Sequence, residues 1–197
     1  MTKKSKLLLT TSILSILPLT TLSVVSCSKN EDKPDFPLYD KEYGLEFNAD
    51  GIVLSSYIPK EHVVIPEYLT FNSIPTSKYY GYKAKIREIG KNAFKDNQII
   101  KEVTIANSVT KIGINAFQNT QLTQVTIPNS VTEIGYDAFS NTQLTQVTIP
   151  NSVKYLSGFW NTKITSITIP NSVTEIDDFA FGSTQLTQVT IPNSVTK

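Results

Sequence analysis

The chain has 197 residues with 18 Lys and Arg and 17 Asp and Glu, which gives a formal net charge of +1. A chain of this length can bury one moderate core, or form a stack of repeats with a small cap. Its near-neutral charge lacks the basic footprint of a nucleic-acid-binding protein, which argues against nucleic acid as a partner.

Residues 1–26 have the composition of a secretory signal peptide. Lys3, Lys4 and Lys6 form a basic start, and residues 7–25 are apolar apart from Ser, Thr and one Pro. An uncleaved transmembrane helix and simple secretion are the alternatives, because residues 7–25 come close to the roughly 20 residues that span a bilayer. The Ser and Thr content favours a cleaved leader.

Cys27 directly follows this apolar stretch and is the single cysteine of the chain. A secreted protein with one cysteine cannot form an internal disulfide, so the thiol needs another role. The run Val24-Val25-Ser26-Cys27 resembles a bacterial lipobox, in which small residues precede a cysteine that becomes the lipidated N-terminus. The resemblance implies a membrane anchor through lipid on Cys27, at the extracellular face of the cell membrane.

Two further segments precede the repeats. Residues 27–42 are polar and charged and contain two prolines, which predicts a tether between the membrane and the folded part. Residues 43–84 are predicted to form an N-terminal β cap, because an exposed solenoid end would leave apolar surface and strand edges open. Within this cap, two short apolar runs flank Asp50-Gly51, a pair that favours a tight hairpin.

A unit of 22 residues recurs in the remainder of the sequence, and one copy reads SVTEIGYDAFSNTQLTQVTIPN. A fixed period of about 20 to 29 residues is typical of a solenoid, in which each coil buries its apolar side against its neighbours. The sequence therefore predicts a β-rich solenoid of leucine-rich-repeat coils with short parallel strands over residues 85–197. The predicted coils are residues 85–107, 108–129, 130–151, 152–171 and 172–193, with a partial coil at 194–197.

The apolar residues of one coil indicate how the coil is closed. In residues 130–151 they are Val131, Ile134, Ala138, Phe139, Leu144, Val147 and Ile149. The last three follow the L-x-x-V-x-I strand spacing, and Pro150 ends the strand. Val131 and Ile134 are predicted to form a second buried step, and Ala138 and Phe139 to fill the opposite arc.

The phrase LTxVTIPNSVTxIGxxAF resembles the repeats of the BspA-like leucine-rich repeat family of bacterial and protist surface proteins. The resemblance covers residues 85–197, with a weaker echo between Val63 and Phe94. It implies a curved or gently twisted solenoid, exposure at the cell surface, and a role in adhesion or host-protein binding, with no catalytic residues. The leader that ends in Ser26-Cys27 is also similar to those of mollicute and other low-GC bacterial lipoproteins.

The outward positions of the strands are the first candidate for a ligand-binding face, because side chains alternate across a strand. Stacked coils would turn these positions into ladders of hydroxyls and amides. The competing interpretation is that Thr serves β-propensity and solubility alone. The candidate residues are Thr123, Gln124, Thr126, Thr145, Gln146, Thr148, Thr165, Ser166, Thr168, Thr187, Gln188 and Thr190.

Aromatic residues are the second candidate for ligand contacts. Tyr79, Tyr80 and Tyr82 cluster in the predicted cap, and Tyr155 and Trp160 mark the fourth repeat, which is two residues shorter than the 22-residue unit. Exposed Tyr and Trp are common anchors in binding sites. The alternative is that they close a small core where a repeat is irregular.

No constellation of catalytic or metal-ligating residues is evident in the sequence. His62 is the single histidine and lies in an apolar strand-like run, which favours a structural role. No cysteine follows Cys27, which excludes thiol nucleophiles and zinc sites with thiolate ligands. We therefore expect no enzyme activity, no metal and no cofactor.

Two functions from different classes remain open. One is an adhesin-like, lipid-anchored protein that binds host, matrix or neighbouring-cell proteins through the solenoid. The other is a passive structural or antigenically variable coat lipoprotein with no specific ligand. The partial coil at residues 194–197 carries no polar cap, so its strand edge would be open to end-to-end self-association with another copy. A longer natural chain explains this open end equally well.

Overall fold

The computed structural model describes residues 33–56 and 59–197, which belong to one compact unit that begins at Lys33. The predicted signal peptide at residues 1–26 and the predicted lipid on Cys27 lie outside the described residues. Within the described ranges the chain forms thirteen β-strands. Those same ranges contain no helix that is long and apolar enough to span a bilayer.

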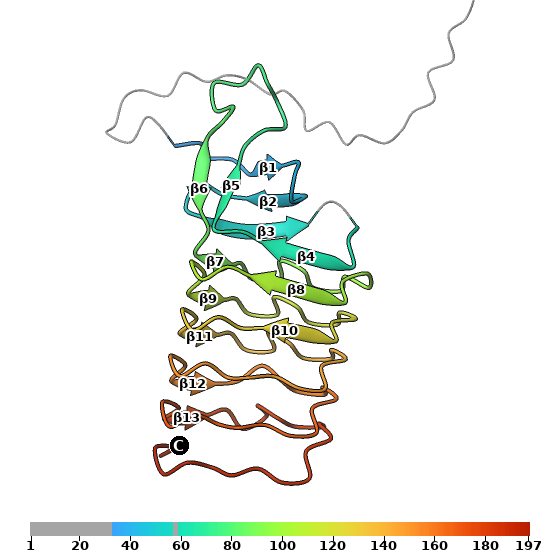
Figure 1. The fold of residues 1–197 in the computed structure, drawn as a ribbon, viewed down its shortest axis with the longest axis vertical. Helices are drawn as coiled ribbons and strands as arrows, with labels where there is room; N and C mark the ends of the chain where they lie inside the picture. Colours follow the sequence, from blue (N-terminus) through green and yellow to red (C-terminus); the bar gives the residue numbers. More distant parts are fainter. Residues whose placement is uncertain (1–32, 57–58) are drawn as a thin grey trace, which may run out of the picture. The chain divides into compact units, whose positions relative to one another are not determined.

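The strands divide into an N-terminal cap and a stack of coils (Figure 1). The cap contains β1 (Leu38–Asp40), β2 (Leu45–Phe47), β3 (Ile52–Ser56), β5 (Tyr68–Thr70) and β6 (Lys83–Lys85). The coils contain β4 (His62–Ile65), β7 (Glu88–Ile89), β8 (Glu102–Ile105), β9 (Lys111–Ile112), β10 (Gln124–Thr126), β11 (Glu133–Ile134), β12 (Tyr155–Leu156) and β13 (Glu175–Ile176).

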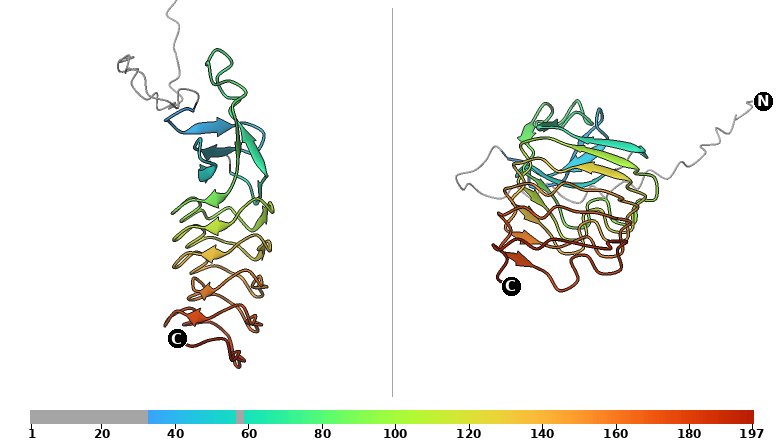
Figure 2. Two further views of the ribbon diagram at one scale, coloured as in Figure 1. Left: turned by 90° about the vertical axis from the view of Figure 1, so that its left-hand side faces the viewer. Right: turned by 60° about the horizontal axis from the view of Figure 1, so that its bottom comes forward.

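Two parallel ladders run along opposite sides of the stack, as the left view of Figure 2 shows. One ladder joins β3, β7, β9 and β11, and the parallel pair of β12 and β13 follows it further along the chain. The other joins β4, β8 and β10. Pairing is in register, so Ile112 lies beside Ile89 and Ile134. This arrangement confirms the predicted β-rich solenoid with short parallel strands.

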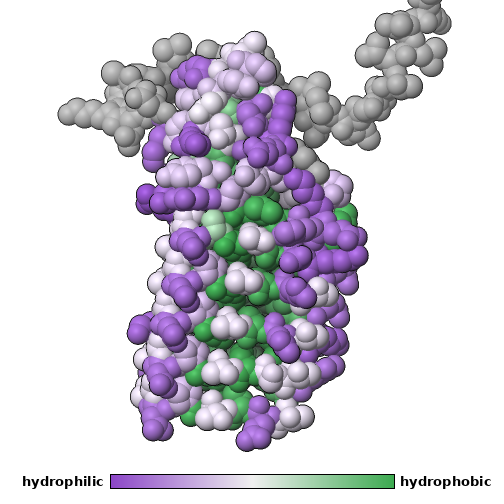
Figure 3. Space-filling model, viewed as in Figure 1, coloured by the Kyte–Doolittle hydropathy of each residue, from purple (hydrophilic) through white to green (hydrophobic). Residues whose placement is uncertain are grey.

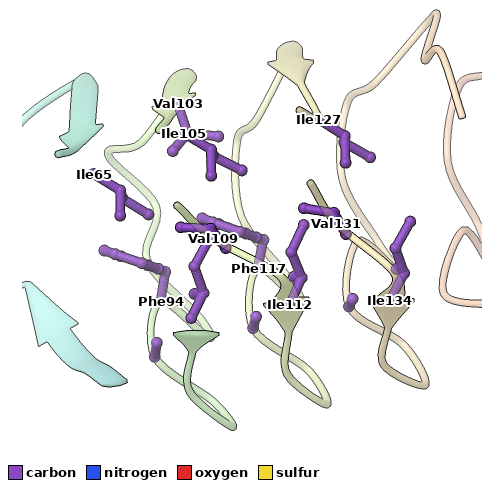
Figure 4. Packing of buried hydrophobic residues seen from close by; sticks show 14 of the residues in the cluster. Ile65, Phe94, Val103, Ile105, Val109, Ile112, Phe117, Ile127, Val131 and Ile134 are labelled. Atoms are coloured by element: carbon purple, nitrogen blue, oxygen red, sulfur yellow. The ribbon is translucent and has the colours of Figure 1, made fainter. Parts of the chain in front are cut away.

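A stack of phenylalanine rings fills the interior between the two ladders. Phe94, Phe117, Phe139, Phe159 and Phe181 come from successive coils, with neighbouring ring centroids 5.0, 5.4, 5.3 and 6.0 Å apart. Adjacent rings are nearly parallel, with interplanar angles of 1° to 12°. Figure 4 shows how valines and isoleucines of the ladders point toward the same interior. Val131 and Ile134 of the predicted second step are buried, as are Ala138 and Phe139 of the predicted opposite arc.

The first three coils each have a glycine directly after a buried isoleucine, at Gly90, Gly113 and Gly135. This glycine permits close approach between coils. A Cβ atom at Gly135 would lie 2.5 Å from the backbone nitrogen of Ile114 in the preceding coil. Since Cβ atoms do not come that close to backbone atoms, alanine would force the two coils apart. In the later coils Ser157 and Asp177 occupy the corresponding positions of the sequence.

The turns beside the phenylalanine stack depend on residues that the sequence analysis did not single out. Asn115, Asn119 and Asn141 have positive φ angles of 56° to 57°, a conformation that Asn adopts more readily than most residues. The Asn115 Nδ2 atom donates to Asn92 Oδ1 at 3.1 Å, and this contact links one turn to the next. The signal was present in the sequence, because Asn recurs two residues before or after the phenylalanine in most coils.

The cap begins earlier in the chain than the sequence predicted. β1 lies within residues 27–42, the segment expected to be a tether, and pairs antiparallel with β2. Leu38 is fully buried, and the Asp40 carboxylate accepts hydrogen bonds from backbone N–H groups that include Thr70 at 2.7 Å. A buried apolar side chain and a buried, satisfied carboxylate explain why this polar segment is ordered. The predicted hairpin at Asp50-Gly51 is confirmed between β2 and β3.

The strands of the second ladder become shorter along the stack. β8 has four residues, β10 has three, and the equivalent residues of later coils are extended without forming strands. Ala106 follows β8 and donates its N–H to Ile65 O at 3.0 Å. Proline stands at this position in every later coil and has no N–H, so this ladder bond cannot form there.

Candidate binding face

The second ladder and the extended segments that continue it bring the twelve predicted polar residues onto one surface, here called the strand face. All twelve side chains are exposed. The surface is hollowed, with an open volume of about 1180 Å³ that extends from β8 to the coil of residues 152–171. Eight of the twelve line this hollow: Thr123, Gln124, Thr126, Thr145, Gln146, Thr148, Ser166 and Thr168.

Strand pairing aligns the outward residues into rows across the coils. Gln124 lies beside Glu102, and Glu102 lies beside His62. A second row contains Thr126, Thr104 and Val64. The strand face therefore continues onto β4 and β8, which the list of candidate residues had omitted. The shared pattern of HVVI and EVTI with the later QVTI could have identified these positions from the sequence.

Charged groups are confined to the end of the strand face nearest the cap. Lys101 Nζ lies 2.9 Å from Glu61 Oε1, and both side chains are well exposed. His62 Nε2 lies 2.9 Å from Thr104 Oγ1 on the neighbouring strand. Beyond this end, the segments 123–127, 145–149, 165–169 and 187–191 contain no ionisable residue. Most of the strand face is thus a neutral hydrogen-bonding surface.

An apolar strip runs along the coils on this face, with hydrophilic residues on both sides of it (Figure 3). Val125 and Ile167 contribute to the strip because they are only partly buried, and Val189 is 38% exposed. The repeat pattern assigned this strand position to the core, which holds for Val103 and Val147. Where the position is partly exposed, the strand face combines apolar contact area with a row of polar groups on either side.

No metal site emerges from the described residues. In residues 33–56 and 59–197, no three His, Cys, Asp or Glu residues lie close enough together to hold an ion. His62 bonds to the hydroxyl of Thr104 on the neighbouring strand. The strand face offers hydroxyl and amide groups that can form hydrogen bonds with a partner.

Comparison with known proteins identifies the family. The BspA type leucine rich repeat region matches residues 54–159 and 87–197, with six copies of the repeat. The chain belongs to the BspA-type leucine-rich repeat family. Proteins of this family are generally binding or scaffold proteins and not enzymes. No curated protein matches the sequence.

Solved structures share the BspA-type fold. A leucine rich cell surface protein from Faecalibacterium prausnitzii is 25% identical with a TM-score of 0.53, and the match covers 84% of this chain and 51% of that one. The leucine rich repeat protein of T. pallidum is 20% identical with a TM-score of 0.57, covering 84% and 71%. The pneumococcal vaccine antigen PcpA is 18% identical with a TM-score of 0.58, covering 82% and 51%. The chain thus spans about half the length of two of these proteins.

The five candidate aromatic residues of this BspA-type protein do not form one site. Tyr79 and Tyr82 are partly buried against the core of the cap, whereas Tyr80 is exposed nearby. Trp160 packs over the next coil, where a Cβ atom at Gly182 would lie 2.9 Å from its Cδ1 atom. Tyr155 lies on β12, in the ladder opposite the strand face. Only the cap tyrosines are close together.

Tyr155 belongs to a polar cluster that is specific to the shortened coil. The buried Ser157 hydroxyl donates to Asp177 Oδ2 at 2.9 Å. Partial burial of Tyr155 raises the pKa of its hydroxyl above the ordinary value, and the negative charge and hydrogen bonding of Asp177 raise it further. Ser157 and Asp177, which stand where the first three coils have glycine, therefore bond to each other across adjacent coils.

We predict that Asp177→Asn lowers the pKa of Tyr155 toward its ordinary value, because the variant removes a neighbouring negative charge. NMR titration of the tyrosine Cζ signals, with Tyr155→Phe to assign the resonance, measures this pKa. The adjacent Asp178→Asn is the matched control and should leave the pKa unchanged. An unaltered Tyr155 titration in Asp177→Asn would contradict the described cluster. Since the pKa is raised in the folded state, the stabilisation from Tyr155 is present below about pH 10 and lost at higher pH.

Proposed function

We propose that this protein is a lipid-anchored cell-surface protein whose strand face binds proteins of a host or of a neighbouring cell. The observation that carries the proposal is the hollow of about 1180 Å³, lined along most of its length by exposed hydroxyl and amide side chains, with Glu102 at the end nearest the cap. The BspA-type repeats and the likeness to a leucine rich cell surface protein of F. prausnitzii support the surface location.

The chemistry of the strand face suits a partner with polar groups and few charges. Gln124 and Gln146 offer amide donors and acceptors, and the threonines offer hydroxyls that do both. Val125 and Ile167 supply apolar contact area at the centre, as in the cores of protein interfaces. Because the central coils carry no ionisable residue on this face, binding should depend only weakly on salt concentration.

The size of the strand face makes multivalent binding part of the proposal. Five adjacent segments at about 4.8 Å spacing and four residues per segment give roughly 300 Å² of projected surface. A stable partner buries about 800 Å² on each side. The cap, the loops or several copies held on one membrane would supply the rest, and a lipid anchor on Cys27 would concentrate those copies.

The lipid anchor itself is inferred from the sequence. Cys27 follows a basic and apolar leader directly and is the single cysteine of the chain. A lipidated cysteine with two or more acyl chains stays on the membrane, whereas a single chain gives only marginal binding.

A passive coat is the second candidate function, and one observation favours it. The outward residues are the same in several coils, since LTQVTIPN occurs at residues 122–129, 144–151 and 186–193. Such uniformity creates a repetitive surface without a specialised position. The binding experiment that follows distinguishes a coat from an adhesin.

We predict that the full-length protein, immobilised and exposed to a panel of host matrix proteins, binds at least one of them saturably. Replacing Thr126, Thr148 and Thr168 with alanine should weaken that binding by about tenfold or more, because each hydroxyl contributes about 0.5–1.5 kcal/mol when hydrogen-bonded. The matched control replaces three exposed threonines on the other side of the stack: Thr110, Thr132 and Thr174.

The control variant should change the dissociation constant less than twofold, since its hydroxyls bond to the backbone of the preceding coil, as Thr110 does to Arg87 O. Surface plasmon resonance provides the measurement. Absence of saturable binding at micromolar concentrations would reject the adhesin in favour of the coat. Equal weakening by both triple variants would reject the strand face as the binding surface.

We predict that Cys27 carries the anchor. Metabolic labelling with an alkyne fatty acid should label the wild-type protein and leave it in the membrane fraction after a carbonate wash. Cys27→Ser should abolish the label, and Ser28→Ala should retain it. Label on the Cys27→Ser variant, or none on the wild type, would contradict the lipid anchor.

A further inference from the structure

The loop between β5 and β6, here called the cap loop and defined as residues 71–82, projects beyond β1 at the end of the molecule opposite the last coil (Figures 1 and 2). Backbone hydrogen bonds order it. Ser77 N donates to Ile74 O at 3.1 Å, Tyr80 N to Ser77 O at 3.0 Å, and Gly81 N to Phe71 O at 2.8 Å. These hydrogen bonds hold the cap loop in a defined shape.

Large apolar side chains are exposed on and beside the cap loop. Ile74 is 52% exposed and Tyr80 is 51% exposed. Phe36 is 41% exposed and packs edge-on against Tyr79, with ring centroids 5.4 Å apart. A single exposed apolar residue is ordinary, but a group of them at the tip of one projection indicates a contact surface. The outward residues of the strand face are by contrast mostly Thr and Gln.

The cap loop and the strand that follows it carry positive charge. Residues 71–85 contain Lys78, Lys83 and Lys85 and no acidic residue, and Lys85 Nζ is paired with Glu67 Oε1 at 3.0 Å. Lys78 Nζ lies 4.7 Å from the centre of the Tyr79 ring, and Lys83 Nζ lies 5.2 Å from that of Tyr68. Tyrosine rings flanked by lysines are typical of protein surfaces at the level of lipid headgroups, where the cations meet anionic lipids.

The length of chain before the described residues limits how far the cap can lie from a lipid on Cys27. Five residues lie between Cys27 and Lys33, so the chain takes six steps, and a fully extended chain covers at most about 3.6 Å per step. Lys33, where the cap begins, would therefore stay within roughly 20 Å of a lipid on Cys27. At that distance the effective concentration of lipid is high, so even a weak contact is occupied.

We propose that the cap loop docks on the membrane that carries the Cys27 anchor. Ile74 and Tyr80 enter the headgroup region, and Lys78 and Lys83 lie against anionic lipids. This inference rests on the lipid anchor of the proposed function and adds a second attachment point. Because the cap loop lies at one end of the stack, docking directs the coils away from the bilayer and leaves the strand face accessible to a partner.

The test uses full-length protein purified from membranes and reconstituted in vesicles of phosphatidylcholine and phosphatidylglycerol. A Ser77→Cys variant receives an environment-sensitive fluorophore, and Gln188→Cys on the last coil is the matched control. Acylated Cys27 has no free thiol and cannot take the dye. Mass spectrometry of the labelled protein therefore reports the anchor separately from the docking.

We predict that the probe at residue 77 shows blue-shifted emission and is quenched by headgroup-level nitroxide lipids, whereas the probe at residue 188 is not. Replacing Ile74 and Tyr80 with serine in the Ser77→Cys background should abolish the quenching, and Tyr136→Ser in a coil should not. Charge reversal of Lys78 and Lys83 should lower the ratio of docked to undocked protein by about tenfold on anionic vesicles.

Circular dichroism should be unchanged in every variant. Equal solvent exposure of the two probes in acylated protein would overturn docking while leaving the anchor intact. A blue shift without nitroxide quenching would also overturn it, because another copy and not lipid would then cover the loop. Dye on Cys27 would show that the lipid anchor is absent. That result would reject both the anchor of the proposed function and the docking that rests on it.

Discussion

The contact between phenylalanine rings of successive coils is the interaction on which the remainder of the molecule depends. Phe139 has one ring neighbour in the preceding coil, Phe117, and one in the following coil, Phe159. A lone coil would order its backbone at a cost of about 1–2 kcal/mol per residue and bury almost no apolar surface in return. Coils of this length are therefore stable only as a stack, which is why the interior is continuous from the cap to the last coils.

The same stacking defines the strand face. In-register pairing of Val103 with Val125 buries one side of the strands and carries the neighbouring Gln and Thr outward in rows. Uniform spacing in the core thus produces uniform spacing of hydroxyls and amides on the surface. The cap covers the apolar end of the stack through β1, β2 and β3, and its projecting loop lies far from the last coil. The continuous core and the strand face are both consequences of one repeat geometry.

The sequence predicted the elements that depend on the repeat period and failed where a local hydrogen bond decides the outcome. The period predicted the solenoid, and the alternation of Thr and Val predicted which side chains would be outward. The early start of β1 depends in part on the backbone N–H of Thr70, which reaches Asp40 from 30 residues away and which no local pattern encodes. The loss of the last bond of the second ladder follows from one substitution, Ala106 against proline in later coils, whose effect requires knowledge of the ladder bond.

A double-mutant cycle tests the central claim most directly. Phe117→Leu and Phe139→Leu, singly and together, are compared by urea unfolding of the full-length chain with the same cycle on Phe94 and Phe159, which are three coils apart. Direct ring stacking predicts a coupling energy of about 0.5–1.5 kcal/mol for the adjacent pair and additivity within about 0.5 kcal/mol for the distant pair. Additive effects in the adjacent pair, or equal coupling in both pairs, would contradict a stack stabilised by contacts between neighbouring coils.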